Sequence, residues 1–253
     1  MNPDGPALAG PRLMRQTWAD IAFVHWAVEP AAVERFMPPG VRPDVLDGST
    51  YVGLIPFRMQ DAGFGRGPTV PWLGTFLETN VRLYSVDDAG RHGVVFLSLE
   101  SSRLVVSALA RLVFGTPYTW ARMTADDAAP RPDGAVHSYE TRRRWPGPRG
   151  AGGLIEVRPG APLPDPSELE HFVTARFGLH TQVLGRTWWV PNTHTAWPLH
   201  RAELVSLDDS LVEAAGFPGL ASTPPASVLW SPGTFTTFGF PRVVGPRRAA
   251  ARV

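Results

Sequence analysis

The sequence predicts a mainly β (α+β) fold that forms a single antiparallel domain with a few short peripheral helices. Its 27 prolines and 25 glycines are scattered along the 253 residues. They divide the chain into segments of about ten residues, a spacing typical of β-sandwiches and barrels. Hydrophobic residues make up 43% of the chain and charged residues 19%, which is the composition of a globular protein rather than of a disordered one.

The predicted strands are short runs rich in β-branched and aromatic residues between glycine and proline turns. In chain order they are 20–28, 50–60, 76–86, 93–100, 118–124, 136–145, 153–158, 179–190, 196–206 and 227–229. No internal repeat is present, and the glycine-rich stretch at 145–153 is typical of a hairpin loop rather than of a domain linker.

Three short helices are predicted between these strands. Residues 30–37 begin with a proline at a first-turn position, and residues 103–114 carry a helical apolar face. Residues 165–177 open with DPSELE, which supplies a capping residue and an acidic first turn. We therefore expect a flexible segment at 1–17, one domain at 18–244 and a disordered basic tail at 245–253.

Charge and residue usage exclude several kinds of chemistry. The 24 basic residues are all arginines and oppose 23 acidic ones, so no strong field attracts nucleic acid or an anionic membrane. Because the chain has no lysine, no lysine Schiff base can form, and because it has no cysteine, thiolate catalysis and disulfides are also excluded.

The expected location is the cytoplasm. The N-terminus, MNPDGPALAGPRLMRQTW, lacks the continuous apolar stretch of a signal peptide, and no run of about 18 apolar residues occurs anywhere. We expect a small-molecule ligand or substrate, no nucleic acid and no membrane partner. Assembly into a homo-oligomer is left open.

The stretch FLETNVRLYSV is the most informative predicted strand. Alternation places Glu78, Asn80, Arg82 and Tyr84 on one face. Such a face can be solvated, which is the commoner case, or it can form a buried network or line a cavity. The acid, amide, guanidinium and phenol in register favour the second interpretation.

The next strand, GVVFLSLESS, carries apolar residues on both faces and is expected to be central and buried. Strict alternation would place Ser98 or Glu100 beside Glu78, where two carboxylates in a closed cavity would bind protons with different affinities. The run YETRRRW places Thr141 and Arg143 on one face, and three consecutive arginines are typical of a solvated edge rather than of an anion site.

The seven histidines do not form a recognisable metal motif. His194 and His200 are six residues apart, and no HExxH pattern occurs. We expect structural roles for most histidines and neither a metal nor a cofactor. Glycine-rich phosphate loops and a G-x-S-x-G elbow are also missing from the sequence.

The chain resembles the YqjF-like family of uncharacterised bacterial proteins through an ordered set of segments. They are PPGVRPDVLDGSTYVGLIPFRM, FLETNVRLY, GVVFLSLESS, RLVFGTPYTWARM, FVTARFGLH and HTAWPLHRAEL. The resemblance runs from about residue 18 to about 204 and more loosely to 243. That family resembles acetoacetate decarboxylase in fold, which implies a closed antiparallel β-cone or barrel with a central pocket.

The same resemblance implies an altered active site. In the decarboxylases a G-x-P-K-K turn delivers the Schiff-base lysine, and GTPYT at 115–119 is similar but has Tyr118 and Thr119 in place of the two lysines. Glu78 is similar to the decarboxylases' strand carboxylate, whereas their early arginine has no match in AFVHWAVEP. The resemblance therefore implies the pocket without lysine Schiff-base decarboxylation.

The expected chemistry is proton transfer next to a carbonyl group, without a cofactor, as in a lyase, hydrolase or isomerase. Glu78 would act as base or acid, Tyr118 would donate to the developing oxyanion, and Arg82 would hold a carboxylate or enolate. The further binding residues expected in this pocket are Asn80, Glu100, Thr119, His25 and His194.

Two alternatives stay open at this point. One is a non-catalytic protein that binds a small ligand in the same pocket, and the other is a structural or interaction domain whose interior is filled by side chains. Under the last alternative, Tyr118 only completes a buried network, and Arg82 only neutralises Glu78.

Overall fold

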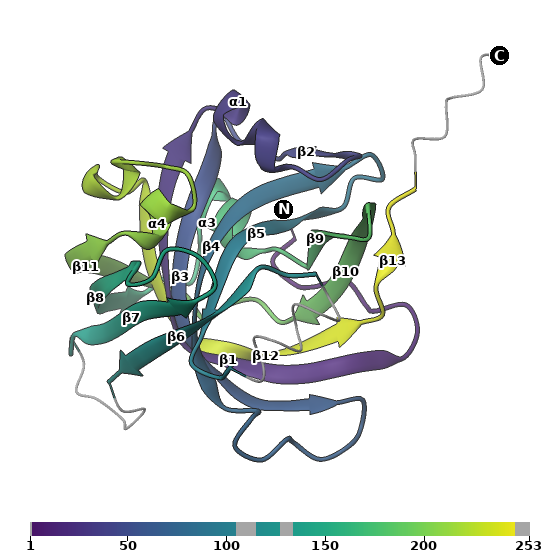
Figure 1. The fold of residues 1–253 in the computed structure, drawn as a ribbon, viewed down its shortest axis with the longest axis horizontal. Coiled ribbons are helices and arrows are strands. Elements are labelled where there is room, and N and C mark those ends of the chain that lie inside the picture. Colours follow the sequence, from purple (N-terminus) through teal and green to yellow (C-terminus); the bar gives the residue numbers. More distant parts are fainter. Residues whose placement is uncertain (1, 105–114, 127–133, 246–253) are drawn as a thin grey trace.

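The computed structural model describes residues 2–104, 115–126 and 134–245, in which β-strands predominate (Figure 1). The strands are β1 (Arg12–Val28), β2 (Val41–Pro43), β3 (Thr50–Phe64), β4 (Phe76–Asp87), β5 (His92–Ser101), β6 (Tyr118–Ala125), β7 (His137–Trp145), β8 (Gly152–Pro162), β9 (Gly178–Val183), β10 (Arg186–His194), β11 (His200–Asp209), β12 (Ser227–Gly239) and β13 (Arg242–Val243). The helices are α1 (Pro30–Val33), α3 (Glu168–Thr174) and α4 (Leu211–Ala214), with 3-10 turns η1 (Glu34–Phe36) and η2 (Leu220–Ser222). The mainly β prediction is confirmed.

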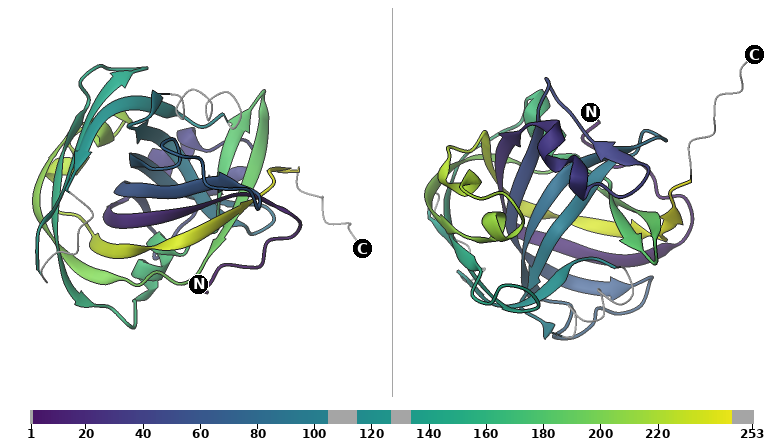
Figure 2. Two further views of the ribbon diagram at one scale, coloured as in Figure 1. Left: turned by 90° about the horizontal axis from the view of Figure 1, so that it is seen from below. Right: turned by 45° about the horizontal axis from the view of Figure 1, so that its top comes forward.

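All of these strands belong to one sheet that closes on itself twice. Their order is β13-β10-β9-β5-β6-β7-β8-β11-β12-β1-β3-β4-β2, with two additional pairings, β4 with β5 and β10 with β12. The result is two closed rings of strands that share one wall, formed by β12, β1, β3, β4 and β5. Figure 2 shows this wall between β6–β8 and β11 on one side and the β9–β10 hairpin on the other.

Each ring encloses a separate hydrophobic core. On the β9 side of the shared wall, the core contains Phe23, Ile55, Tyr84, Phe172 and Leu179, among others. On the β7 side, it contains Val24, Leu54, Leu83, Ile155 and Val157, among others. Because successive residues of a strand point to opposite faces, each wall strand supplies both cores, and this requires apolar residues in near-continuous runs.

Several strands differ from their predicted lengths. β1 begins at Arg12, within the segment expected to precede the domain, and pairs with β12 from Arg12 to His25. β12 extends over residues 227–239 rather than 227–229. Pairing between the two extensions supplies stabilisation that their local sequences do not predict, because residues 12–19 contain no valine or isoleucine and residues 230–239 contain Pro232, Gly233 and Gly239.

The single strand predicted at 179–190 is a hairpin. Leu184 and Gly185 form its turn, with φ values of 50° and 74°, and leucine rarely adopts such a conformation. The all-antiparallel expectation is also corrected, because β5 runs parallel to β6 and to β9.

The helix predictions had mixed outcomes. At α3 the side chain of Ser167 accepts from the backbone of Glu170, whose carboxylate accepts from Ser167 in return, which confirms the capped start. Most of the helix predicted at 103–114, and all but the first residue of the tail predicted at 245–253, lie outside the described residues. No helix within the described ranges is long and apolar enough to cross a membrane.

Candidate active site

The polar face predicted for β4 is buried against the β9-side core. Glu78 and Asn80 are each only 3% exposed, and Tyr84 is fully buried. The commoner interpretation, a strand face in water, is therefore wrong. These groups form hydrogen-bonded clusters inside the molecule, where an unpaired polar group would be costly.

Glu78 and Tyr118 form the first cluster. The phenolic hydroxyl of Tyr118 donates to Glu78 Oε2 over 2.8 Å. Burial raises the pKa of Glu78 to about 7, although hydrogen bonds from Tyr118 and Asn80 act in the opposite direction. The pKa of Tyr118 is raised well above its usual range by its own burial and by the neighbouring Glu78. Near neutral pH, Glu78 can therefore give or take a proton.

The GTPYT turn is what brings Tyr118 to Glu78. Gly115 has a φ of 62°, and a Cβ on it would lie 2.6 Å from Val183 Cγ2, so this position requires glycine. After the turn, β6 runs parallel to β5 with Leu99 opposite Tyr118 and Glu100 opposite Thr119. Tyr118 therefore points to the β9 side and Thr119 to the β7 side.

Glu100 does not join Glu78, because β5 contains an extra residue. Phe96 lies opposite Arg82, but Ser98 lies opposite Val81, so Leu97 is accommodated as a bulge. Beyond this bulge the alternation of β5 is reversed. Ser98 and Glu100 consequently face the β7 side, contrary to the prediction from strict alternation.

Glu100 instead pairs with Arg143 on the β7 side. Arg143 Nη2 lies 2.5 Å from Glu100 Oε1, and its Nε lies 3.3 Å from Oε2. Both side chains are buried, whereas Arg142 and Arg144 are exposed. The solvated-edge prediction therefore fails for Arg143. Burial raises the pKa of Glu100, although hydrogen bonds from Arg143 oppose the change.

Arg82, Tyr84 and His25 form the second cluster on the β9 side. Arg82 Nε donates to the Tyr84 hydroxyl over 3.2 Å, and its Nη2 donates to the Val173 carbonyl over 2.9 Å. The Tyr84 hydroxyl donates to the same carbonyl over 3.0 Å, so its oxygen can accept from His25 Nε2, 2.5 Å away. Burial lowers the pKa of His25, and the charges of Arg82 and Arg176 lower it further.

Arg82 has no acidic partner among the described residues, and it is not fully buried. Its neighbour Arg176 is paired with Asp44. Glu78 has no hydrogen bond or ion pair with Arg82, so the alternative in which Arg82 only neutralises Glu78 is wrong. Sequence reasoning had placed Tyr84 on this face without giving it a role, and it had no means of placing the Val173 carbonyl there.

His194 lies beside aromatic rings. Its Nδ1 donates to the Thr195 carbonyl over 2.7 Å, and its ring lies 5.0 Å from that of Trp197. Trp197 also lines a cleft of about 450 Å³ between α3 and the segments 162–166 and 196–200. None of Glu78, Tyr118 and Arg82 lines this cleft.

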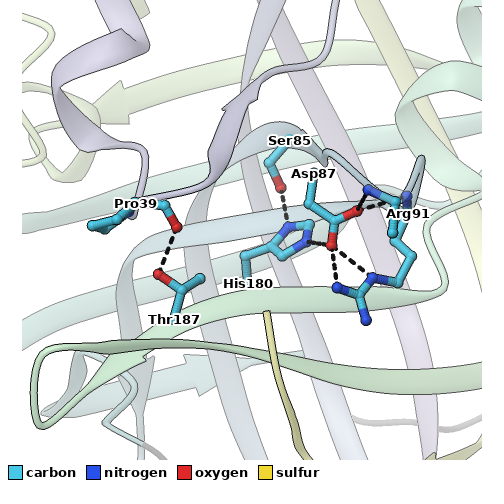
Figure 3. Close-up of polar contacts among 7 residues, drawn as sticks. Pro39, Ser85, Asp87, Arg91, His180 and Thr187 are labelled. Carbon is cyan, nitrogen blue, oxygen red and sulfur yellow. Dashed lines mark hydrogen bonds and ion pairs between the residues drawn. The ribbon is translucent and has the colours of Figure 1, made fainter. Parts of the chain in front are cut away.

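A hydrogen-bonded chain of Ser85, His180 and Asp87 resembles a hydrolase triad (Figure 3). Ser85 Oγ is 2.9 Å from His180 Nδ1, and His180 Nε2 is 3.2 Å from Asp87 Oδ2. Asp87 also pairs with Arg91. The side chains of Ser85, His180 and Asp87 are each 1% exposed or less. Each member of this network is already engaged by its neighbours, and Asp87 is held by Arg91 as well, so we assign the network a structural role in joining β4 to β9.

His180 makes a testable contribution to stability. Burial lowers the pKa of His180 from 6.5 to about 4. Between pH 4 and pH 6.5, His180 is therefore protonated in the unfolded chain but neutral in the folded protein. Stability should therefore fall as the pH falls from 6.5 towards 4, by up to about 3 kcal/mol from this residue. Urea unfolding at several pH values should show a weaker acid loss in His180→Gln than in the wild type. Parallel pH profiles would contradict the assignment.

No group of three or more histidine, aspartate or glutamate side chains in the described ranges is placed to hold a metal ion.

Among the sequence-predicted residues, the structure brings together Glu78, Asn80 and Tyr118 in one cluster and Arg82 and His25 in another. It places Glu100 and Thr119 on the opposite side of the wall.

Comparison with known proteins identifies relatives over most of the chain. Residues 15–234 match the family DUF2071, described as an uncharacterized conserved protein. The uncharacterized protein YqjF of Bacillus subtilis (strain 168) is 27% identical over 206 residues, which cover 81% of this chain and 82% of that one.

Solved structures show the same fold at low sequence identity. The enduracididine biosynthesis enzyme MppR, complexed with the condensation product of pyruvate and imidazole 4-carboxaldehyde, is 16% identical with a TM-score of 0.63 over 94% of this chain and 91% of that one. Acetoacetate decarboxylase from Legionella pneumophila is 15% identical with a TM-score of 0.62 over 96% and 93%. An acetoacetate decarboxylase-like enzyme from Sphingomonas wittichii RW1 is 14% identical with a TM-score of 0.60 over 94% and 96%.

Proposed function

The chain belongs to the DUF2071 family, and from this premise we propose that it is an enzyme acting on a carbonyl compound by acid–base catalysis, without a Schiff-base lysine. The observation that carries the proposal is the buried Glu78 carboxyl group, which has a pKa of about 7 and accepts a hydrogen bond from Tyr118. A group that titrates near the working pH is the most effective general acid or base.

The wider fold supports a carbonyl substrate. Solved structures with this fold include an acetoacetate decarboxylase and an enzyme crystallised with a pyruvate condensation product. Those names belong to other proteins, and the sequence of this chain lacks any lysine for covalent catalysis. Proton transfer is the chemistry that its own side chains can supply.

The proposed step is removal of a proton from the carbon next to a carbonyl group. Ionised Glu78 takes the proton, and the electron pair of the broken C–H bond moves toward the carbonyl to form an enolate. Tyr118 then shares its hydroxyl proton with the enolate oxygen, which lowers the energy of the developing negative charge. Glu78 then returns the proton to the opposite face of that carbon or to another carbon of the enolate system, while the carbonyl reforms and Tyr118 recovers its hydroxyl proton, so the product is an isomer of the substrate.

Turnover of a panel of β-keto acids and related carbonyl compounds tests the proposal. Glu78→Gln should lower kcat by roughly 10²–10⁴-fold because it removes the base. Tyr118→Phe should lower kcat by roughly 10²–10³-fold because it removes an oxyanion donor. Glu213→Gln, at an exposed carboxylate in α4, is the matched control and should retain wild-type rates.

Equal rates in all four proteins would contradict the mechanism. Binding of panel members by the wild type without any turnover would instead favour the alternative function, a non-catalytic ligand-binding protein of the same fold.

A further inference from the structure

Arg82 is a partly exposed cation on the β9 side of the wall, with its guanidinium 5.7 Å from the centre of the Phe23 ring and 5.5 Å from that of the Tyr84 ring. Hydrogen bonds within the described residues engage its Nε and Nη2, and none engages its Nη1. The described residues give this cation two aromatic rings but no carboxylate, so it is available to pair with a bound anion. A carboxylate is a well-matched anion, because guanidinium nitrogens donate to both of its oxygens in a fork.

The two clusters of the site are far apart along β4. Glu78 and Arg82 are separated by four residues, which corresponds to about 13 Å between their Cα atoms in an extended strand. Arg82 leans away from Glu78, since it contacts Tyr84 and α3. Glu78 contacts Tyr118, at the other end of this face. A three- or four-carbon keto acid is too short to touch both groups.

Apolar side chains cover the space between the two clusters. Ile55 and Leu99 lie on either side of Asn80 on the neighbouring strands, and both are buried. Phe96 lies opposite Arg82 on β5 and is only partly buried, as is Arg82 itself. Two adjacent side chains on central strands are therefore still accessible at this position. An apolar chain fits such surroundings better than a polar one.

From this spacing we propose that the site takes an elongated oxo-carboxylate. Its carboxylate binds Arg82, an apolar spacer crosses Phe96, and its carbonyl group reaches Glu78 and Tyr118. The inference rests on the proposed function, and it adds the class of substrate.

Binding of butanoate, hexanoate, octanoate and decanoate, measured by calorimetry, tests the proposal without requiring turnover. Affinity should increase along the series in the wild type, and octanoate should bind better than octanol. Arg82→Met should weaken octanoate binding by roughly 10- to 100-fold, the range for a hydrogen bond to a charged group. Arg142→Met, which removes an exposed arginine of β7, should bind like the wild type.

A second variant keeps the test valid if Arg82→Met does not fold. Phe96→Trp fills the spacer region and should weaken decanoate binding while leaving butanoate binding nearly unchanged.

Equal affinity for butanoate and octanoate, or unchanged octanoate binding in a folded Arg82→Met protein, would overturn the substrate class. Rapid turnover of three- and four-carbon keto acids would overturn it while leaving the proposed acid–base function standing. The expected binding pattern without turnover of long oxo acids would instead overturn that function alone.

Discussion

Replacing Arg143 by methionine is expected to lower the free energy of unfolding by about 3–5 kcal/mol. Glu100 would remain fully buried on the β7 side of the wall without the guanidinium that now lies 2.5 Å away. Methionine fills a similar volume but cannot donate hydrogen bonds to the carboxylate. Urea unfolding at pH 7, followed by circular dichroism, measures the change.

Two further variants show whether the lost pairing is the cause. Arg142→Met removes a neighbouring exposed arginine and should change stability by no more than about 0.5 kcal/mol. The double variant Arg143→Met/Glu100→Met removes both charges and should recover much of the loss, because an apolar pair avoids the desolvation cost. A double variant as unstable as Arg143→Met would show that packing, rather than the unpaired carboxylate, accounts for the effect.

Glu78→Gln is expected to stabilise the protein at alkaline pH, although it lowers the proposed activity. The pKa of Glu78 rises from 4.5 to about 7 on folding, so the folded protein holds this proton more tightly than the unfolded chain does. Stability therefore falls as the pH rises from 4.5 to 7, and above pH 7 the ionised Glu78 costs up to about 3 kcal/mol. Glutamine has no ionised form and avoids this cost.

Urea unfolding of wild type and Glu78→Gln at pH 4.5 and pH 8 measures this difference. The gain in stability should be present at pH 8 and nearly lost at pH 4.5, where Glu78 is protonated in the folded protein. Glu213→Gln should show no such dependence, because its carboxylate is exposed. A gain of equal size at both pH values would contradict the ionisation of a buried Glu78.

Local sequence patterns predicted the residues that share a strand face, but only within an unbroken strand. The assignment of Glu78, Asn80, Arg82 and Tyr84 to one face follows from alternation in β4, which the structure shows to be regular on that strand. The same reasoning failed for Glu100 because the bulge at Leu97 reverses the alternation of β5. Nothing in the sequence LSLE distinguishes a bulge from a regular strand.

Sequence patterns could not predict contacts between segments that are distant in the chain. Arg143 looked like part of a solvated run because its two neighbours are exposed, and its partner Glu100 lies 43 residues earlier. The role of Tyr84 depends on the Val173 carbonyl, which α3 brings from 89 residues away. Tyr118 and Glu78 could be paired beforehand only through the family resemblance of the GTPYT turn.

The double closure of the sheet affects how this protein can associate with other chains. Within the described residues, the strands at the ends of the sheet order are β13, with two residues, and β2, with three residues that include Pro43. Proline lacks an N–H group, and strands this short offer few unpaired backbone groups to an incoming strand. Edge-to-edge strand addition, the usual route to β-aggregation, therefore has little surface to begin from at these two ends. Copies that join at these two ends would have to do so through side-chain contacts instead.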